Sequence, residues 1–214
     1  MTMSTASMPP RLDVSGLPTS AMDERSPLWW GNTLLIFIET TTLGIMLASY
    51  FYLRQNFDQW PPPKVDVHPP ILHPVPSLGA ATADVVLMAL ACIPMYWTDM
   101  AARRKERGKV LGGLALMFVV ACVAMALRWR EFSATHFWWN DNAYASTVWT
   151  TLGLALTYQI AAAAEFLIMG LWIARHGLDS KHGLDVTLAG GFWYWVAGTG
   201  LILYAVLFWG PRVL

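Results

Sequence analysis

Five apolar segments, each long enough to cross a lipid bilayer, constrain this chain more than any other feature of its sequence. A helix needs roughly 20 apolar residues to cross about 30 Å of hydrocarbon. Hydrophobic residues make up 56% of the chain and charged residues 13%, whereas roughly 25% of residues are charged in a soluble domain. Much of the apolar surface must therefore face lipid. We predict an all-α membrane protein with spans at residues 29–53, 80–100, 110–127, 143–174 and 186–209.

The polar segments outside these spans differ from one another. Residues 1–28 contain four prolines among serine, threonine and mixed charges, so we expect a disordered or extended tail rather than a cleavable signal. Residues 54–79 are rich in proline, which excludes a helix and favours an extended surface loop. Residues 101–109 form a short basic turn, and residues 128–142 form a polar, aromatic loop at the membrane interface. Residues 29–214 then make up one transmembrane domain.

Basic residues are distributed unevenly between the two ends of the predicted bundle. Because the spans alternate in direction, nine lysines and arginines fall on the side of the N-terminus and five on the other side. Cytoplasmic loops carry the excess of basic residues. We therefore expect a multi-pass protein of a bacterial plasma membrane, with the N-terminus in the cytoplasm and the C-terminus outside. The 14 basic and 14 acidic residues balance, which gives no indication of a nucleic-acid partner.

The predicted spans contain no histidine suited to bind haem or copper. Redox centres inside membrane helices need histidine ligands, but all five histidines fall in loops or at predicted helix ends. Cys92 and Cys122 lie in apolar runs without CxxC spacing, and we interpret them as small buried side chains. We therefore expect no catalytic, cofactor-binding or metal-binding residue in this chain.

Three carboxylates, Glu39, Asp84 and Glu165, lie within the predicted spans, and no lysine or arginine falls deep enough in them to pair with these acids. A charged group at the bilayer centre costs roughly 2.5–3.5 kcal/mol, so each acid should be protonated or turned toward the bundle interior. Glu39 lies near the midplane and is either functional or a neutral, hydrogen-bonded support. Asp84, close to the start of its helix, should be an interfacial cap or a polar contact.

The sequence resembles subunit III of the haem–copper oxidases, in its short five-helix form. Residues 29–54, WWGNTLLIFIETTTLGIMLASYFYLR, are similar to the family's first helix, with Glu39 at the position of its buried carboxylate. Residues 126–132, ALRWREF, resemble the aromatic and acidic exit from its third helix, with Glu131 at the acidic position.

The last two helices continue the resemblance but depart from it at three positions. NAYASTVWTTLGL and GGFWYWVAGTGLILYAVLF resemble the start of the family's fourth helix and its aromatic last helix, so the likeness covers about residues 28–210. The family places three buried histidines in these helices, where this chain has Ala155, Tyr158 and Tyr194. The resemblance therefore implies a divergent branch.

Membership of this family implies a subunit without a redox centre. Such a subunit packs against subunits I and II, which carry haem and copper, and it stabilises subunit I and supports proton uptake in aerobic electron transport by a cytochrome c oxidase type of complex. It also implies two helix groups, the first two helices and the last three, around a cleft filled with membrane phospholipid. Arg103, Arg104 and Lys105 would contact lipid phosphates, and Tyr158 would be the hydrogen-bond partner of Glu39.

Three other interpretations stay open at this point. A small membrane carrier or proton channel would use Glu39, Asp84 and Glu165 as a relay, although the sequence shows no inverted repeat and no deep cation. A subunit III-like protein of a nitric-oxide reductase would share the fold, and so would a purely structural assembly protein.

Overall fold

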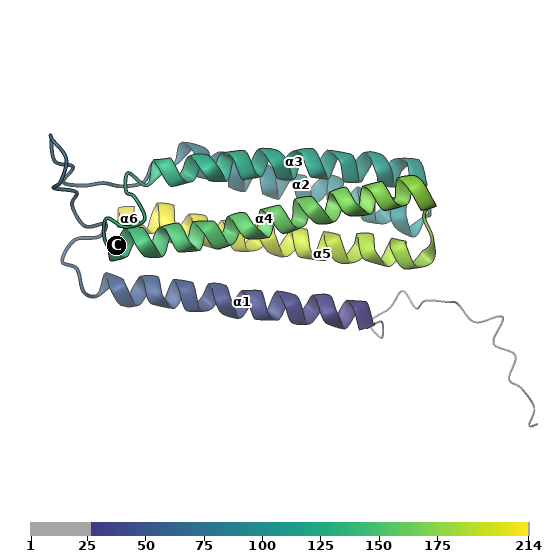
Figure 1. Cartoon of the computed structure of the whole chain (residues 1–214), viewed down its shortest axis with the longest axis horizontal. Helices are drawn as coiled ribbons and strands as arrows, with labels where there is room; N and C mark the ends of the chain where they lie inside the picture. Colours follow the sequence, from purple (N-terminus) through teal and green to yellow (C-terminus); the bar gives the residue numbers. More distant parts are fainter. Residues whose placement is uncertain (1–26, 214) are drawn as a thin grey trace, which may run out of the picture.

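The computed structural model describes residues 27–213, except for the side chains of residues 180 and 181. The predicted tail, apart from its last two residues, lies outside this range. Five helices are long and apolar enough to cross a membrane, which confirms the predicted all-α class with five spans (Figure 1). The helices are α1 (Pro27–Arg54), α2 (Gly79–Arg103), α3 (Arg107–Ala134), α4 (Ala143–His176) and α5 (Ser180–Leu203), the last continued by a π-helical segment η1 (Tyr204–Trp209) and a short α6 (Gly210–Val213).

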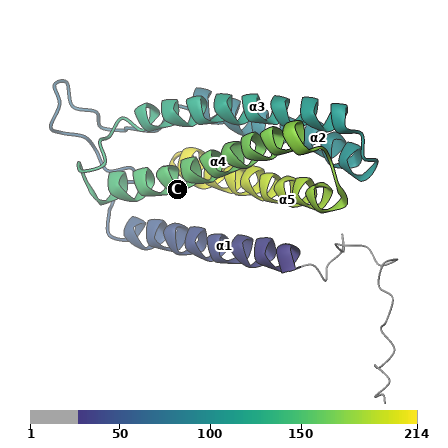
Figure 2. The ribbon, with the colours of Figure 1, turned by 45° about the vertical axis from the view of Figure 1, so that its right-hand side comes forward.

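Four of the helices, α2 to α5, form a closely packed bundle, and α1 lies along one side of it. The largest interfaces join α3 to α2 and to α4, and α2 also packs against α5. Helix α1 packs against α4 and α5, and it stands apart from the other helices in two views (Figures 1 and 2). In its most apolar window 11% of the residues are buried, against 44% in α4. Most of the α1 surface is therefore left for lipid or another protein.

The expected division into the first two helices and the last three was wrong. Helix α2 belongs with α3, α4 and α5, whereas its interface with α1 is slight at most among the described residues. The reason is the connection between them, because the 54–79 stretch is long enough to let α2 return at a distance from α1. The short basic turn 101–109 joins two helices of the same group and does not cross between groups.

The third helix is longer than its apolar run. Residues 128–134, expected to belong to an interfacial loop, continue α3 to Ala134. The side chains of Arg128 and Glu131 in this last part are buried and pair with each other at 2.5 Å. Because the two charged side chains pair with each other, they can be buried and the helix can continue. A hydropathy profile does not detect this pairing.

The proline-rich stretch forms an ordered cap at one end of the bundle. It contains no helix between Arg54 and Gly79, as its prolines predict, and an antiparallel bridge pairs Lys64 with Ile71. The Trp60 indole donates a 2.8 Å hydrogen bond to the hydroxyl of Tyr50 on α1, and both side chains are buried. The loop is thereby fixed to the end of α1.

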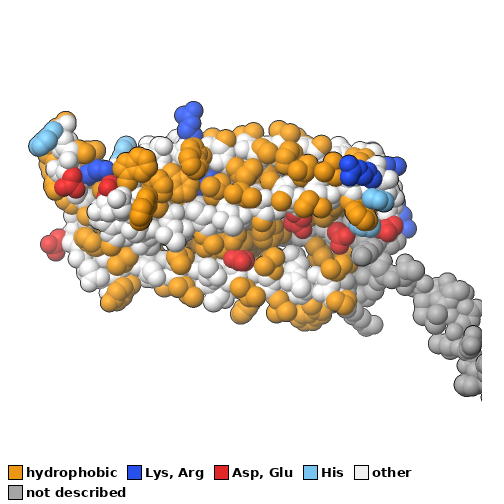
Figure 3. All heavy atoms as spheres, viewed as in Figure 1, with side chains coloured by type: hydrophobic (Ala, Val, Ile, Leu, Met, Phe, Trp, Pro, Cys, Tyr) orange, Lys and Arg blue, Asp and Glu red, His pale blue; other side chains and the backbone are white. Residues whose placement is uncertain are grey.

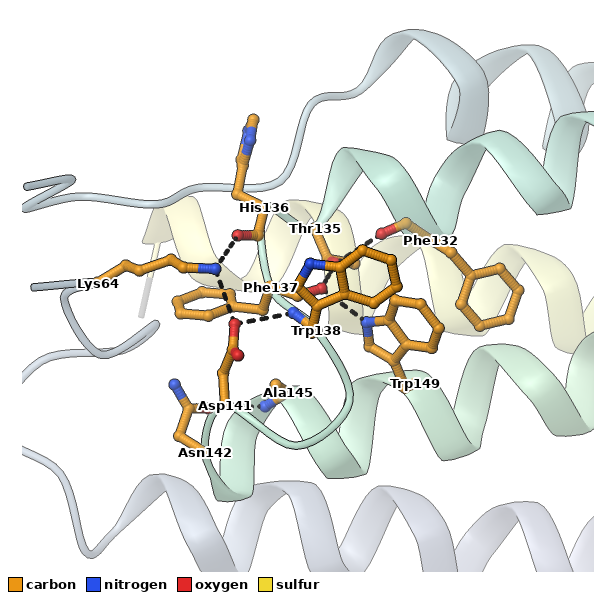
Figure 4. Close-up of polar contacts among 10 residues, drawn as sticks. All are labelled: Lys64, Phe132, Thr135, His136, Phe137, Trp138, Asp141, Asn142, Ala145 and Trp149. Carbon is orange, nitrogen blue, oxygen red and sulfur yellow. Dashed lines mark hydrogen bonds and ion pairs between the residues drawn. The ribbon is translucent and has the colours of Figure 1, made fainter. Parts of the chain in front are cut away.

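The loop between α3 and α4, residues 135–142, lies at the same end and is fixed to the proline-rich loop by Lys64 (Figure 4). The Lys64 ammonium group donates to Asp141 Oδ2 at 2.7 Å and to the His136 carbonyl at 3.1 Å. Asp141 Oδ2 also accepts the Trp138 backbone N–H at 2.8 Å. Asn142 caps α4 by accepting the backbone N–H of Ala145 at 2.8 Å, a usual role for asparagine at a helix start.

The surface agrees with a protein that spans a membrane. On the face seen in Figure 3, hydrophobic side chains are spread along the whole length of the bundle, whereas the lysines and arginines lie mainly toward its two ends. Exposed tryptophans include Trp30 near the start of α1 and Trp138 and Trp139 at the loop end. Tryptophan is enriched at membrane–water interfaces, so these residues mark the two boundaries of the spanning region.

Candidate functional site

Glu39 contacts Tyr158 across the boundary between α1 and the rest of the bundle. The Tyr158 hydroxyl donates to Glu39 Oε2 at 2.9 Å, which is the pairing proposed from the sequence. The role of the pair in proton uptake stays a prediction. The Tyr158 ring packs edge to face on Trp195, with ring centroids 4.8 Å apart, so its hydroxyl is held toward α1.

Two further polar contacts join α1 to α5. The Trp195 indole N–H donates to Thr40 Oγ1 at 2.9 Å, and the Asn32 amide donates to the Leu188 carbonyl at 3.4 Å. Hydrogen bonds across helices add to the association of membrane helices, where the hydrophobic effect is weak. Polar contacts therefore fix the first half of α1 to the bundle. In its second half, Leu43 and Tyr50 pack into an apolar core with residues of α4 and of the C-terminal segment.

Glu165 lies in a groove between α1, α4 and α5. The groove has a volume of about 820 Å³, and Glu165, Asp185, Asn32 and His182 are the polar side chains among mainly apolar lining residues. It opens near the N-terminal part of α1, at the same end as the turn between α4 and α5. Acidic side chains are visible along the line where α1 meets the bundle (Figure 3). Glu165 thus lines this groove, and its expected role stays a prediction.

Asp84 does not cap its helix, whose N-cap residue is Leu78; it makes a polar contact, the other expectation, within a buried polar cluster. It is fully buried, and the Arg128 guanidinium donates to its Oδ2 at 2.6 Å. The Gln159 amide nitrogen lies 3.2 and 3.3 Å from its two oxygens. The same Arg128 pairs with Glu131 at 2.5 Å. Asp84, Arg128, Glu131 and Gln159 are each 0–2% exposed, and they are called the Arg128 cluster below.

This cluster corrects one expectation from the sequence. No cation was expected to reach the intramembrane acids, but Arg128 pairs directly with Asp84. The error arose because Arg128 and Glu131 were assigned to a loop. Their spacing of three residues places both on one face of a helix, and this signal would have extended α3 and revealed the pair. The three carboxylates Glu39, Asp84 and Glu165 occupy three different environments rather than one relay.

The basic turn contains intrahelical ion pairs. Arg103 Nε donates to Asp99 Oδ2 at 3.0 Å, and Lys109 pairs with Glu106 at 2.6 Å. Arg104 borders a small hollow of about 280 Å³ together with Tyr96 and Trp97. The side chains of Arg103, Arg104 and Lys105 are exposed, so they are accessible to lipid headgroups. Contact with phosphate stays a prediction.

The positions that depart from the family have different surroundings. Ala155 is buried in the apolar core, Tyr158 contacts Glu39, and Tyr194 is 39% exposed. Within residues 27–213, no group of three or more histidine, cysteine, aspartate or glutamate side chains is arranged to hold a metal ion.

The fold and these sites define a multi-pass helical membrane protein with buried carboxyl groups. A sequence model of the family described as "Cytochrome c oxidase subunit III" matches residues 17–211. The chain therefore belongs to the cytochrome c oxidase subunit III family. It is similar to a protein named "Cytochrome c oxidase subunit 3" from Latimeria chalumnae, at 23% identity over 150 residues. That similarity covers 70% of this chain and 55% of the relative, so the chain spans about half the length of this curated relative.

Proposed function

We propose that the chain is the non-redox subunit III of a haem–copper terminal oxidase in aerobic electron transport. The observation that carries the proposal is the family match over residues 17–211, together with five helices suited to cross a membrane. Haem and copper are assigned to partner subunits I and II. The chain itself then contributes to the complex by packing and through its buried polar groups.

The proposed role is to stabilise subunit I and to support proton uptake. Helix α1 supports the first part, because it presents large exposed apolar side chains, including Phe37 at 70% and Ile38 at 58%. These side chains are available to a partner subunit or to phospholipid. Glu39 supports the second part, because its carboxyl group is held by Tyr158 beside the groove-lining helices α4 and α5.

The proposed location is a bacterial plasma membrane, with the N-terminus in the cytoplasm. In this orientation the basic turn 101–109 and the groove lined by Glu165 lie on the cytoplasmic side. The cap formed by residues 55–78 and 135–142 then lies outside. Membrane phospholipid is the proposed further partner, with Arg103, Arg104 and Lys105 as contacts to its phosphates.

Purification of the tagged chain from native membranes in mild detergent tests the proposal. The purified complex should contain haem and copper and should reduce oxygen, and the chain separated from its partners should show no Soret absorption. Reduction of nitric oxide in place of oxygen would favour the reductase alternative. A haem-free chain that purifies alone and conducts protons in liposomes would favour the carrier or channel and overturn the proposal.

The proton-uptake role has its own test in the purified complex. Glu39→Gln should leave the complex assembled but slow its oxygen reduction or shorten its activity over many turnovers. Tyr52→Phe, at an exposed position of the same helix, is the control. Equal behaviour of wild type and Glu39→Gln in turnover and in duration of activity would leave Glu39 with a purely structural role.

A further inference from the structure

The Arg128 cluster has an imbalance of charge. It contains two carboxyl groups, on Asp84 and Glu131, and within the part of the chain that the structure describes, the cation that pairs with both is Arg128. Gln159, the fourth member, is neutral. With both carboxyl groups ionised, the cluster would hold one net negative charge at positions that are 0–2% exposed. Burial of an uncompensated charge is costly, and such groups usually become neutral instead.

The hydrogen bonds distinguish the two carboxyl groups. Asp84 accepts hydrogen bonds from Arg128 and from the Gln159 amide, so donors face both of its oxygens. Glu131 Oε2 accepts one from Arg128, whereas Glu131 Oε1 is buried and has no donor facing it. Donors directed at a carboxylate favour its charged form. Asp84 is therefore the better-supported anion.

The two carboxyl groups are also held on one guanidinium, since Arg128 Nη2 lies 2.6 Å from Asp84 Oδ2 and Arg128 Nη1 lies 2.5 Å from Glu131 Oε2. Two carboxylate anions on one guanidinium would repel each other, and neither could donate to the other, because an ionised carboxylate only accepts hydrogen bonds. A proton on Glu131 would supply the missing donor, and it would also make the cluster neutral. The charge count and the placement of both carboxyl groups on one guanidinium thus favour the same proton.

We propose that the Arg128 cluster is a binding site for a single proton, which is held by Glu131 and donated to Asp84, while Asp84 remains ionised against Arg128. The site joins α2, α3 and α4, in the half of the bundle nearest the cap. Gly200 of α5 adjoins it, because a Cβ there would lie 2.5 Å from Met88 Cε and 3.9 Å from Arg128 Nη2. The site is separate from Glu39 and does not depend on the proposed partners.

Infrared spectroscopy of the purified full chain tests this inference. A protonated carboxyl group has a carbonyl stretch that an ionised one lacks, and this band shifts in D2O. Glu131→Gln should remove one such band from the wild-type spectrum. Asp84→Asn should remove the same band, since one remaining carboxylate balances Arg128 and needs no proton. Glu165→Gln, a change on α4 outside the cluster, should leave that band in place.

Arg128→Gln should strengthen the carbonyl band, whereas the carboxyl variants should remove it. Without the cation, both carboxyl groups should be protonated, so the signal from the cluster should increase to about twice its wild-type intensity. A spectrum unchanged by Glu131→Gln would overturn the proposal. A band lost in Glu131→Gln but retained in Asp84→Asn would also overturn it, because burial of Glu131 alone would then hold the proton. Circular dichroism and elution volume identify any variant that has not folded.

Discussion

The hydroxyl of Tyr158 on α4 lies 2.9 Å from Oε2 of Glu39 on α1. The contact joins α1, the spanning helix with the smallest buried share, to α4, which has one of the two largest. By the resemblance described for the sequence, Tyr158 stands where the family would place a buried histidine. A tyrosine can donate a hydrogen bond from its hydroxyl to the carboxyl group. Unlike histidine, it does not take up a proton and become a cation near neutral pH. Tyr158 thus supplies a polar contact from α4 to α1 with a side chain other than histidine.

Tyr158→Phe should weaken the attachment of α1, because it removes the hydroxyl and keeps the ring. A hydrogen bond of this kind contributes about 0.5–1.5 kcal/mol, so the free energy of unfolding should fall by an amount in this range. Glu39→Gln should cost less, since glutamine still offers an oxygen to Tyr158. Thermal unfolding in detergent measures both. Tyr52→Phe on the exposed face of α1 is the control, and equal stability of the Tyr158 and Tyr52 variants would argue against the contact.

Apolar length and proline content were sufficient to predict the five helices and the loop between α1 and α2. Each depends on a local property of the chain, such as the absence of charge over a bilayer thickness. The pairing of Tyr158 with Glu39 needed more, because it came from a family position and not from the residues themselves. The structure places these two side chains in contact.

Helix grouping and the Arg128 cluster could not be predicted in the same way. Whether α2 packs on α1 or on α3 depends on interfaces between residues far apart in the chain, and hydropathy is similar for both arrangements. Arg128 was excluded from the membrane on its charge alone, but its pairing with Asp84 and Glu131 removes that charge from lipid. Burial of an ion pair is a tertiary property that a window of sequence does not contain.

Gly113→Ala should destabilise the interface between α2 and α3. A Cβ at Gly113 would lie 2.9 Å from Thr98 Cβ and would overlap Thr98 Oγ1. Thr98 is itself buried and hydrogen-bonded to the Pro94 carbonyl at 2.8 Å, so it has little freedom to move away. Overpacking of this kind typically costs about 1–3 kcal/mol. The loss should appear as a lower unfolding temperature in detergent.

Two other glycines provide matched comparisons for this variant. Gly112→Ala adds a methyl group to the same helix where nothing lies within 4 Å, so it should leave stability unchanged or slightly higher. Gly200→Ala meets the flexible end of Met88, at 2.5 Å from Cε, and should cost less than Gly113→Ala. If Gly112→Ala and Gly113→Ala reduce stability equally, close packing of Gly113 on Thr98 is not the cause.

The link between Lys64 and Asp141 should make the stability of the cap depend on pH. The hydrogen bond from Lys64, with a second from the Trp138 backbone, lowers the pKa of Asp141 from its ordinary value. A lowered pKa contributes stability that is fully present above the ordinary aspartate pKa. The contribution is lost as the pH falls through the lowered folded-state pKa. Acidification should therefore weaken the cap, and neutral pH should not.

Asp141→Asn should remove this part of the pH dependence. The difference in unfolding temperature between wild type and variant should be largest near neutral pH and should shrink as the pH falls below the ordinary aspartate pKa. Asp66→Asn, at an exposed aspartate of the neighbouring loop, is the control and should show no such trend. A difference that stays constant at all pH values would mean that Asp141 acts only through its shape.

Cysteine labelling tests which end of the bundle faces the cytoplasm. The basic turn and the cap lie at opposite ends of the spanning helices, so one label at each end decides the orientation. Cys92 and Cys122 are free thiols within α2 and α3 and should first be replaced by alanine. Lys105→Cys then reports on the basic turn, and Val65→Cys, at a position that is 61% exposed, reports on the cap.

The excess of basic residues on the side of residue 105 predicts that this side is cytoplasmic. A maleimide that does not cross membranes should therefore label Val65→Cys in intact cells and Lys105→Cys only after the cells are made permeable. Both positions should react fully in detergent, which controls for their accessibility. Labelling of Lys105→Cys from outside, with protection of Val65→Cys, would reverse the orientation. It would also place the groove with Glu165 outside, where it could not take up protons from the cytoplasm.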